Sequence, residues 1–587
     1  MASVTTDRRQ GVSSSAAVKV ACRAASTVNL TLSGEQTVDG IAIVTNDRVF
    51  VKNQTDATEN GIYDANTSDW TRSPDWDGAY DVQEGTLITS NNGTINGDTM
   101  WRVTTTGTIT VGTSILTFEK AAVSDSSTVA YTPTGTGAVP STVQTKLRES
   151  VTPEDFGAVG DGVTDDYTAL ANAYTAHIAQ GVPLILLGKT YATGTGLVWA
   201  SNNALILGAG KKVSVIKRLA GIASGTPTIH ITPGDWGVFR DFSVDNNSID
   251  GNGIHLYLSN ESTFSSITVD NVTAGYAFAV QQSSSNNWYD IFCNNCDKIL
   301  RVYNVSNQLD FYDVGGIGTS TTEAAYKLEN SFRLNFFGGI IEHDGRGVEI
   351  GSDIDGVAFN GTYIESLNTS AALSDILIGE ATGGNTHAVS FDDCYITQNA
   401  DKGAPCIELT ADARNVKISG GRISRSIAGT DSLITFIGSS KYVKIENIDT
   451  WTVSACLFID AGATAITGLT ISNVHSVNAA NTIDVNNANG CQIFNTPMNI
   501  TVGSTAARVD IFGATGTITD NSSVARQHSG SGLLDLNGGI LGMAERTNPG
   551  APSANGVYVW TQDDGGGKTQ IVARFNTGAV QVIATEP

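Results

Sequence analysis

The chain has 587 residues and a net charge of −24, with 40% apolar and 16% charged residues. This length exceeds one ordinary globular core, and the composition excludes both a disordered chain and a membrane protein. The acidic balance and the lack of a basic stripe exclude duplex nucleic acid as a partner, because its phosphates require cationic side chains. Since there is no long apolar run and no signal-like start, we expect a soluble, unsecreted protein without a membrane partner.

The first 152 residues predict a small domain followed by a connection. Residues 1–125 contain short β-branched and aromatic runs between turn signals, for example at 41–45 and 48–52, which indicates an all-β module. Residues 126–152 are rich in Ser, Thr, Gly and Pro and include a short helical stretch at 141–148. We predict that they form a neck between domains.

A sequence repeat dominates residues 153–525. Two apolar residues flank one variable residue, turn-like residues follow, and the second apolar residue marks each copy. Successive markers are 20 to 32 residues apart, about 25 on average. The markers are Ile267, Ile291, Phe311, Phe336, Phe359, Phe391, Ile418, Ile445, Ile471 and Ile493.

The repeat predicts a parallel β-helix. One unit of this length with alternating polarity cannot bury its apolar face alone, so units must stack strand on strand. Two further columns support the stacking. Apolar residues recur five positions after the marker, and asparagines recur two positions after it. The apolar set is Val272, Cys296, Ile341, Ile364, Ile396, Ile423 and Met498, and the asparagine set is Asn447, Asn473 and Asn495.

The remaining features predict no metal and no cofactor. The seven cysteines are scattered, and Cys293 and Cys296 lack a second pair at zinc spacing. We expect buried free thiols. Asp161, Asp165 and Asp166 precede a helical stretch and suit turn and capping roles. Residues 526–587 contain strand-like runs and form a separate C-terminal module.

Several segments together resemble bacteriophage tailspikes. Residues 155–166 (DFGAVGDGVTDD) resemble the opening of the pectate-lyase-like β-helix in that family, and residues 135–149 are similar to its neck. Residues 46–63 with 70–72 resemble a β module shared by phage tail fibres and spikes. Residues 568–570 and 578–586 resemble a C-terminal spike module.

The resemblance implies an all-β homotrimer built on a right-handed parallel β-helix. It implies that residues 1–125 attach to the phage tail and that residues 526–587 form a trimerisation or tip domain. Such a protein is made in the host cytoplasm, resides on the virion tail and acts at the host surface. The implied partner is a bacterial surface polysaccharide, capsule or O-antigen.

One pair of carboxylates suits glycoside cleavage. Glu342 and Glu365 occupy the same position, six residues after the marker, on consecutive units. Strand alternation directs both outward, and the strand spacing of about 4.8 Å brings the carboxyls within the range that glycosidases use. We therefore predict Glu342 and Glu365 as catalytic residues of an endo-acting glycoside hydrolase. Two glutamates on an ordinary solvated face are the competing explanation.

Aromatic and cationic residues around this pair predict sugar binding. Tyr363, Tyr395, Arg346 and Arg422 are the candidates, because aromatic faces stack on sugars and Arg binds carboxylates. Other residues compete for the catalytic role: His343, which titrates near neutral pH, and the carboxylates Asp310, Asp313 and Asp375.

Three functions remain open from the sequence. The leading one is a tailspike depolymerase that hydrolyses polysaccharide, with elimination by a lyase on the same fold as its variant. The second is a binding-only adhesin, and the third is a structural tail component. The 32-residue interval between Phe359 and Phe391 favours the first two, since a structural part needs no insertion there. Host, linkage, stereochemistry and a site shared between subunits stay undetermined.

Overall fold

The computed structural model describes most of the chain and divides it into two compact units, Met1–Glu149 and Ser150–Pro587. The described residues are 17–78, 81–121, 126–127, 129–367, 372–379, 384–399, 402–410, 413–426, 431–453, 457–460, 466–478, 480–514, 516, 518–520 and 557–586. The predicted part 526–587 therefore lies partly outside the described residues. No helix among them is long and apolar enough to cross a membrane.

The first unit is a β module with two small cores. Its strands are β1 (Ala24–Ala25), β2 (Gln36–Val38), β3 (Ile41–Ile43), β4 (Arg48–Val51), β5 (Gly61–Asp64), β6 (Thr71–Arg72), β7 (Leu87–Ser90), β8 (Thr99–Val103) and β9 (Phe118–Lys120). Phe50 and Trp76 lie in one core, and Trp70 lies in the other. The neck carries β10 (Ala130–Tyr131), β11 (Ser141–Thr142) and α1 (Val143–Leu147), which Thr142 caps.

A short helical cap precedes the β-helix. It contains η2 (Pro153–Phe156), β12 (Asp161–Asp165) and α2 (Tyr167–Gln180). Asp166 is the N-cap of α2, and its carboxylate accepts hydrogen bonds from the backbone N–H groups of Val159 and Gly160 at 2.7 and 3.1 Å. Asp161 accepts two backbone bonds from the turn that follows it. The side chain of Asp166 thus orders the preceding turn, while Oδ1 of Asp165 accepts a 3.0 Å hydrogen bond from the backbone N–H of Tyr167, the first residue of α2. The predicted turn and capping roles of Asp161, Asp165 and Asp166 are confirmed in this form.

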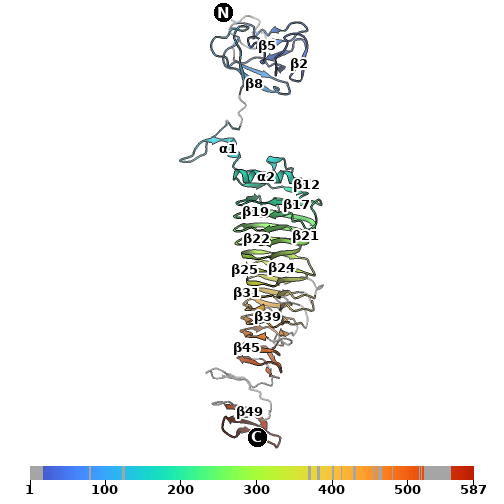
Figure 1. The fold of residues 1–587 in the computed structure, drawn as a ribbon, viewed down its shortest axis with the longest axis vertical. Helices are drawn as coiled ribbons and strands as arrows, with labels where there is room; N and C mark the ends of the chain where they lie inside the picture. The colour runs from blue at the N-terminus through green and yellow to red at the C-terminus, as the bar shows by residue number, and fades with distance from the viewer. Residues whose placement is uncertain are drawn as a thin grey trace. The chain divides into compact units, whose positions relative to one another are not determined.

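The rest of the unit confirms the predicted parallel β-helix, whose strands from β12 to β45 stack one above another (Figure 1). Three ladders of parallel strands run along it, and four long strands bend through two or three ladders: β19 (Val238–Ile249), β21 (Thr263–Gln281), β22 (Asn287–Tyr303) and β23 (Ser306–Gly318).

The first ladder adds β13 (Leu184–Leu186), β16 (Leu205–Gly208), β25 (Ser331–Phe337), β28 (Ile354–Asn360), β31 (Thr386–Asp392), β34 (Ala413–Arg414), β35 (Lys417–Ser419), β38 (Lys444–Glu446), β41 (Ile466–Thr467), β42 (Thr470–Ser472), β45 (Ala488–Phe494) and β47 (Arg508–Phe512). The second adds β14 (Thr190–Thr193), β17 (Val215–Arg218), β26 (Ile340–His343), β29 (Tyr363–Ser366), β32 (Tyr395–Gln398), β36 (Arg422–Arg425), β39 (Asp449–Thr452) and β43 (His475–Ser476). The third adds β15 (Leu197–Trp199), β18 (Ile229–Ile231), β20 (Ile254–Tyr257), β24 (Ala324–Leu328), β27 (Arg346–Ile350), β30 (Ile376–Ile378), β33 (Ile407–Leu409), β37 (Ile434–Phe436), β40 (Leu457–Asp460), β44 (Thr482–Asp484), β46 (Asn499–Val502) and β48 (Ile518–Asp520). Near the C-terminus, β49 (Val557–Asp563), β50 (Thr569–Phe575) and β51 (Gln581–Thr585) form an antiparallel sheet.

A stack of aromatic rings fills the core behind the first ladder. Successive ring centroids are 4.1 to 5.9 Å apart, and the planes differ by at most 25°. The stack consists of Trp199, Phe239, Phe264, Trp288, Phe311, Phe336, Phe359 and Phe391. Because each ring belongs to a different coil, this stack joins coil to coil throughout that part of the solenoid.

The predicted asparagine ladder is also present. The Nδ2 group of Asn473 donates to Oδ1 of Asn447 at 3.1 Å, and Nδ2 of Asn495 donates to Oδ1 of Asn473 at 3.0 Å. All three residues have φ near +50°, in the left-handed region that Asn tolerates better than most residues. This conformation turns the chain from the first ladder into the second.

The register differs from the prediction at two coils. Phe264 and Trp288, rather than Ile267 and Ile291, pair in line with Phe311. Ile267 and Ile291 belong to the second ladder and pair onward to Val314. The marker was misassigned there because Ile267-Thr-Val269 in the second ladder alternates like the first-ladder motif. With the corrected markers Phe264 and Trp288, the outward position six residues later holds Asp270 and Asn294.

Candidate active site

The second ladder places the two predicted catalytic glutamates side by side. Glu342 on β26 pairs in register with Glu365 on β29, and the column continues through Thr397 and Ser424 to Trp451. The residues beside them, Ile341 and Ile364, are fully buried. Since side chains alternate along a strand, both glutamates point outward, about 4.8 Å apart at the backbone. The predicted placement of the pair, in register and facing outward on consecutive coils, is confirmed.

The two glutamates have different hydrogen-bonding surroundings. The Nδ2 group of Asn399 donates to Oε1 of Glu365, and the Tyr363 phenol is also within hydrogen-bonding reach of Glu365. Burial and then the charge of Glu365 raise the pKa of Tyr363, so the phenol keeps its proton and donates. No residue within the described ranges forms a hydrogen bond or ion pair with Glu342.

A second outward column flanks the glutamates. Tyr363, Tyr395 and Arg422 pair in register on β29, β32 and β36, two residues before the glutamate column. Tyr395 is 49% exposed and Arg422 is also exposed, whereas Tyr363 is partly covered. These three predicted binding residues therefore share the outer surface of the second ladder with Glu342 and Glu365.

His343 is not on this surface. Its side chain is 1% exposed and points into the solenoid, with Nδ1 3.1 Å from the carbonyl oxygen of Gly345. Burial, reinforced by Lys402, holds the pKa of His343 well below its usual range, so the imidazole is neutral. His343 directly follows Glu342 in the sequence, but alternation places the two side chains on opposite faces of the strand, so His343 does not compete for the catalytic role on this surface.

Asp375 is buried in the same interior cluster. Its Oδ1 is 3.1 Å from Nζ of Lys402 and 3.6 Å from Nε2 of His343, and Oδ2 accepts a hydrogen bond from Gln398 at 3.3 Å. Burial raises the pKa of Asp375 to about 6 despite the neighbouring Lys402 and Arg425. A carboxylate with no exposed surface is inaccessible to a polymer, so this cluster has a structural role.

The buried cluster around Asp375 also anchors the connections that lead from the second ladder to the third. Arg425 donates to Oε1 of Gln398 at 2.6 Å and to the carbonyl oxygen of Asp431 at 2.5 Å. Lys402 donates to the carbonyl oxygen of Gly345 at 2.5 Å. These bonds fix the backbone of two connections, at Gly345 after β26 and at Asp431 after β36.

The other predicted residues lie elsewhere. Asp310 is on the first ladder and accepts a hydrogen bond from Asn335 at 2.8 Å. Asp313 has φ of 51° and forms the turn between the first and second ladders. Arg346 is on the third ladder, where it forms a 2.8 Å ion pair with Glu349. None of these three shares the second-ladder surface of the glutamate pair.

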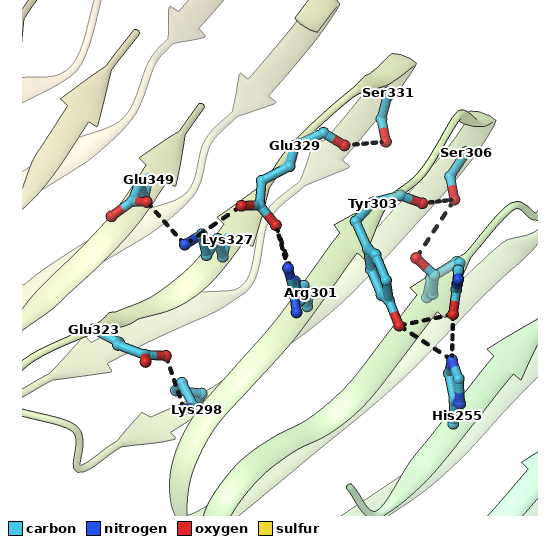
Figure 2. A network of polar contacts seen from close by, with 12 residues as sticks. His255, Lys298, Arg301, Tyr303, Ser306, Glu323, Lys327, Glu329, Ser331 and Glu349 are labelled. Carbon is cyan, nitrogen blue, oxygen red and sulfur yellow. Dashed lines mark hydrogen bonds and ion pairs between the residues drawn. The ribbon is translucent and has the colours of Figure 1, made fainter. Parts of the chain in front are cut away.

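The sequence reasoning missed a charged band on the third ladder, shown in Figure 2. Arg301 pairs with Glu329 at 2.8 Å, Lys298 pairs with Glu323 at 2.8 Å, and Lys327 lies 3.4 Å from both Glu329 and Glu349. Most of these pairs join one coil to the next. These carboxylates form ion pairs that connect neighbouring coils. Glu342 and Glu365 differ from them, because neither has a cationic partner among the described residues.

The described residues contain no group of three or more His, Cys, Asp or Glu side chains arranged to hold a metal ion. Six cysteines of the described residues are buried and form no disulfide bond with one another: Cys22, Cys293, Cys296, Cys394, Cys406 and Cys491. Cys456 lies outside the described residues.

Comparison with known proteins gives distant similarities to phage proteins. No protein-family model matches the chain. A segment of 102 residues is 34% identical to the preneck appendage protein of Bacillus phage PZA, and equally to the pre-neck appendage protein of Bacillus phage phi29. This segment covers 17% of this chain and 11% of each relative, so the chain matches only a small part of their length.

Solved structures of phage tailspike proteins are similar to the chain at low sequence identity. Tailspike protein 3 of bacteriophage CBA120 is 13% identical, with 98% of each chain covered and a TM-score of 0.46. A tailspike protein variant of E. coli bacteriophage HK620, solved in complex with a pentasaccharide, is 13% identical, with 67% of this chain and 83% of that chain covered and a TM-score of 0.47.

Proposed function

We propose that this chain is a phage tail appendage that binds a bacterial surface polysaccharide and cleaves it by hydrolysis. The main observation that supports this proposal is that Glu342 and Glu365 lie in register on an outer face. Tyr363, Tyr395 and Arg422 lie beside them. The 34% identity of a segment to phage preneck appendage proteins supports the tail location. Binding without cleavage, and cleavage by elimination, are the alternatives.

The contacts of the two glutamates suggest their separate roles. Hydrogen bonds hold a carboxylate in a fixed position, so Glu365, with donors from Asn399 and Tyr363, suits the nucleophile. Glu342 suits the general acid that protonates the leaving glycosidic oxygen. Carboxyls about 5 to 5.5 Å apart favour a glycosyl-enzyme intermediate, which water then hydrolyses with retention.

The neighbouring column would orient the sugar chain. Tyr395 offers an exposed ring for stacking, and Arg422 offers a bidentate donor to a hydroxyl or carboxylate group. Because these residues follow one another coil by coil, a polysaccharide bound to both runs along the solenoid axis.

The test is the release of reducing ends from purified capsular and O-antigen polysaccharides. Glu342→Gln and Glu365→Gln should each reduce the rate by about 10²–10⁴-fold, because each removes a proton donor or an anion. Glu408→Gln on β33 is the matched control, since Glu408 is an outward glutamate on the third ladder. Unchanged rates in both active-site variants would contradict hydrolysis at this pair. Polysaccharide binding without release by the wild-type chain would favour the adhesin, and unsaturated products would favour the lyase.

We further propose that the chain assembles as a homotrimer, with residues 1–125 attaching to the tail, residues 126–152 forming the neck, residues 153–525 binding glycan and residues 526–587 forming a trimerisation or tip module. Light scattering should give three times the mass of 61.3 kDa. A monomeric mass at micromolar concentration would contradict the assembly.

A further inference from the structure

A surface depression lies on the second ladder, several coils before the glutamate pair. Its volume is about 560 Å³, and its lining consists of Thr190, Lys212, Val215, Lys217, Asp245, Asp270, Asn271 and Asn294. Carboxylates, amides and ammonium groups therefore share one hollow, which provides both hydrogen-bond acceptors and donors. This polar lining differs from the apolar lining that is typical of a pocket for a hydrophobic ligand.

The depression and the candidate active site lie along the same outer face of the second ladder. Lys217, Asp245 and Asp270 pair in register, and Asn294 follows Asp270 in the same outward column. The column then passes through Ile317 to Glu342 and Glu365. Six coil steps of about 4.8 Å separate Lys217 from Glu365, so the column is about 29 Å long.

The surface between the two places is mainly apolar. The adjacent outward column contains Phe292, then Gly315, then Ile340 on successive coils. Gly315 has no side chain, and a Cβ built there would be 2.2 Å from the carbonyl oxygen of Ile340. Gly315 is buried, and the Ile340 backbone occupies the space where its side chain would lie, so a bound chain would contact Ile340, which is 44% exposed.

The polar groups in the depression are ordered by one another. Oδ1 of Asp270 accepts from Asn294 at 3.1 Å, while Oδ2 is ion-paired with Lys212. Oδ1 of Asp245 accepts from Asn271 at 3.0 Å. Lys217 donates to the carbonyl oxygen of Gly162 at 3.3 Å, and no carboxylate of the described chain is within ion-pair distance of it.

We propose that this depression is a distal sugar-binding subsite for the same polysaccharide chain that Glu342 and Glu365 cleave, a step that rests on the proposed function. Lys217 and the amides would donate to sugar oxygens, and Asp245 would accept from sugar hydroxyls, while the buried Asp270 orients Lys212 and Asn294. Two carboxylates against two lysines leave no net positive charge. We therefore assign the subsite to a hydroxyl-rich, uncharged sugar residue rather than to an acidic one.

The proposal predicts that affinity depends on the length of the glycan. A fragment that spans about 29 Å reaches both places, whereas a di- or trisaccharide reaches only one. The Glu365→Gln chain provides a background for binding measurements in which cleavage is suppressed. The probe is a polysaccharide that the wild-type chain binds, chosen from a panel of purified capsular and O-antigen polysaccharides. Mild acid hydrolysis followed by size fractionation gives its short and long fragments.

Calorimetric titration of these fragments is the experiment. In the Glu365→Gln background, Lys217→Ala and Asp245→Asn should each weaken binding of long fragments by about tenfold. Short fragments should bind as before, since they contact the surface near Tyr395 and Arg422. Glu408→Gln, on the third ladder, should leave the affinity for both lengths unchanged.

Two results would overturn the subsite. The first is that long and short fragments bind the Glu365→Gln chain with equal affinity. The second is that adding Lys217→Ala or Asp245→Asn to that chain leaves its affinity for long fragments unchanged. Failure of the proposed hydrolysis would have a different signature: Glu365→Gln would keep full cleavage while the length dependence persisted. Tighter binding of uronate-containing fragments that depends on Lys217 would overturn the assignment to an uncharged sugar.

Discussion

Asp375 and Lys402 form a 3.1 Å ion pair inside the solenoid, and neither side chain has any exposed surface. Removing one partner of a buried pair leaves an uncompensated charge, which typically costs about 3–5 kcal/mol. Lys402 follows β32 and Asp375 precedes β30, so the pair connects two consecutive coils behind Glu365.

This pair predicts a specific dependence of stability on pH. The pKa of Asp375 is about 6 in the folded protein and 3.8 ordinarily. The folded state therefore holds this proton more tightly, and the contribution to stability is present below pH 4 and is lost as the pH rises through 6. Asp375→Asn removes the titration, so its stability relative to wild type should improve by about 3 kcal/mol between pH 4 and pH 7.

The comparison at each pH isolates Asp375 from its neighbours. His343, Lys402 and Arg425 face the carboxyl, and neutral His343 acts in the opposite direction, because its depressed pKa favours the folded state at higher pH. Since both proteins contain His343, its effect largely cancels in the difference. Thermal midpoints at matched scan rates measure the trend, and a pH-independent difference would contradict it.

The aromatic stack predicts that one ring carries much more stability than its neighbour in sequence. Phe336 is buried between Phe311 and Phe359 at 4.6 and 4.4 Å, whereas Phe337 on the same strand is 37% exposed. Phe336→Ala should lower the free energy of unfolding by about 3–5 kcal/mol, because it opens a cavity. Phe337→Ala should cost about 1 kcal/mol. Similar midpoints for the two variants would show that the stack is not a stabilising element.

The turn at Asn473 separates backbone conformation from hydrogen bonding. Its φ of 51° costs an alanine about 1–2 kcal/mol. Asn473→Gly removes the ladder bonds to Asn447 and Asn495 but accepts this φ. We therefore expect Asn473→Ala to unfold at a lower temperature than Asn473→Gly, with both below wild type. Equal midpoints would mean that the ladder bonds alone account for the loss.

Some parts of the site were predictable from the sequence because they depend on strand alternation. The period of about 25 residues and the outward direction of Glu342 and Glu365 follow from apolar residues on alternate positions. Asp270 was missed because Ile267-Thr-Val269 imitates the marker motif of another ladder. Alternation alone also places His343 inside.

The interior cluster was not predictable in the same way. Lys402 and Asp375 lie in connections between ladders, where no alternation fixes the direction of a side chain. The charged band of the third ladder depends on pairing between coils, as Lys327 contacts both Glu329 and Glu349. Such contacts require the register, which the repeat gave only in part.

The charged band predicts salt-sensitive coupling without an effect on glycan binding. Arg301 bonds Glu329 through Nε at 2.9 Å and through a terminal nitrogen at 2.8 Å. A double-mutant cycle with Arg301→Met and Glu329→Gln should give a coupling energy of about 1 kcal/mol that shrinks as salt is added. The same variants should bind polysaccharide as the wild type does. Lost glycan affinity would instead identify this band as a binding surface.

The contact between Asn399 and Glu365 tests whether the carboxylate must be held in place. Asn399 donates to Glu365 and accepts a 2.6 Å hydrogen bond from Ser426 on the next coil. If Glu365 is the nucleophile, Asn399→Ala should lower kcat about tenfold, the value of one hydrogen bond to a charged group, with little change in KM. Ser426→Ala, which removes only the outer bond, should have a smaller effect of the same kind. Asn399→Asp should be worse than Asn399→Ala, because it places a third carboxylate against the pair. A higher KM with unchanged kcat in Asn399→Ala would mean that Asn399 contacts the sugar instead. Equal kcat in all three variants would mean that the strand alone positions Glu365.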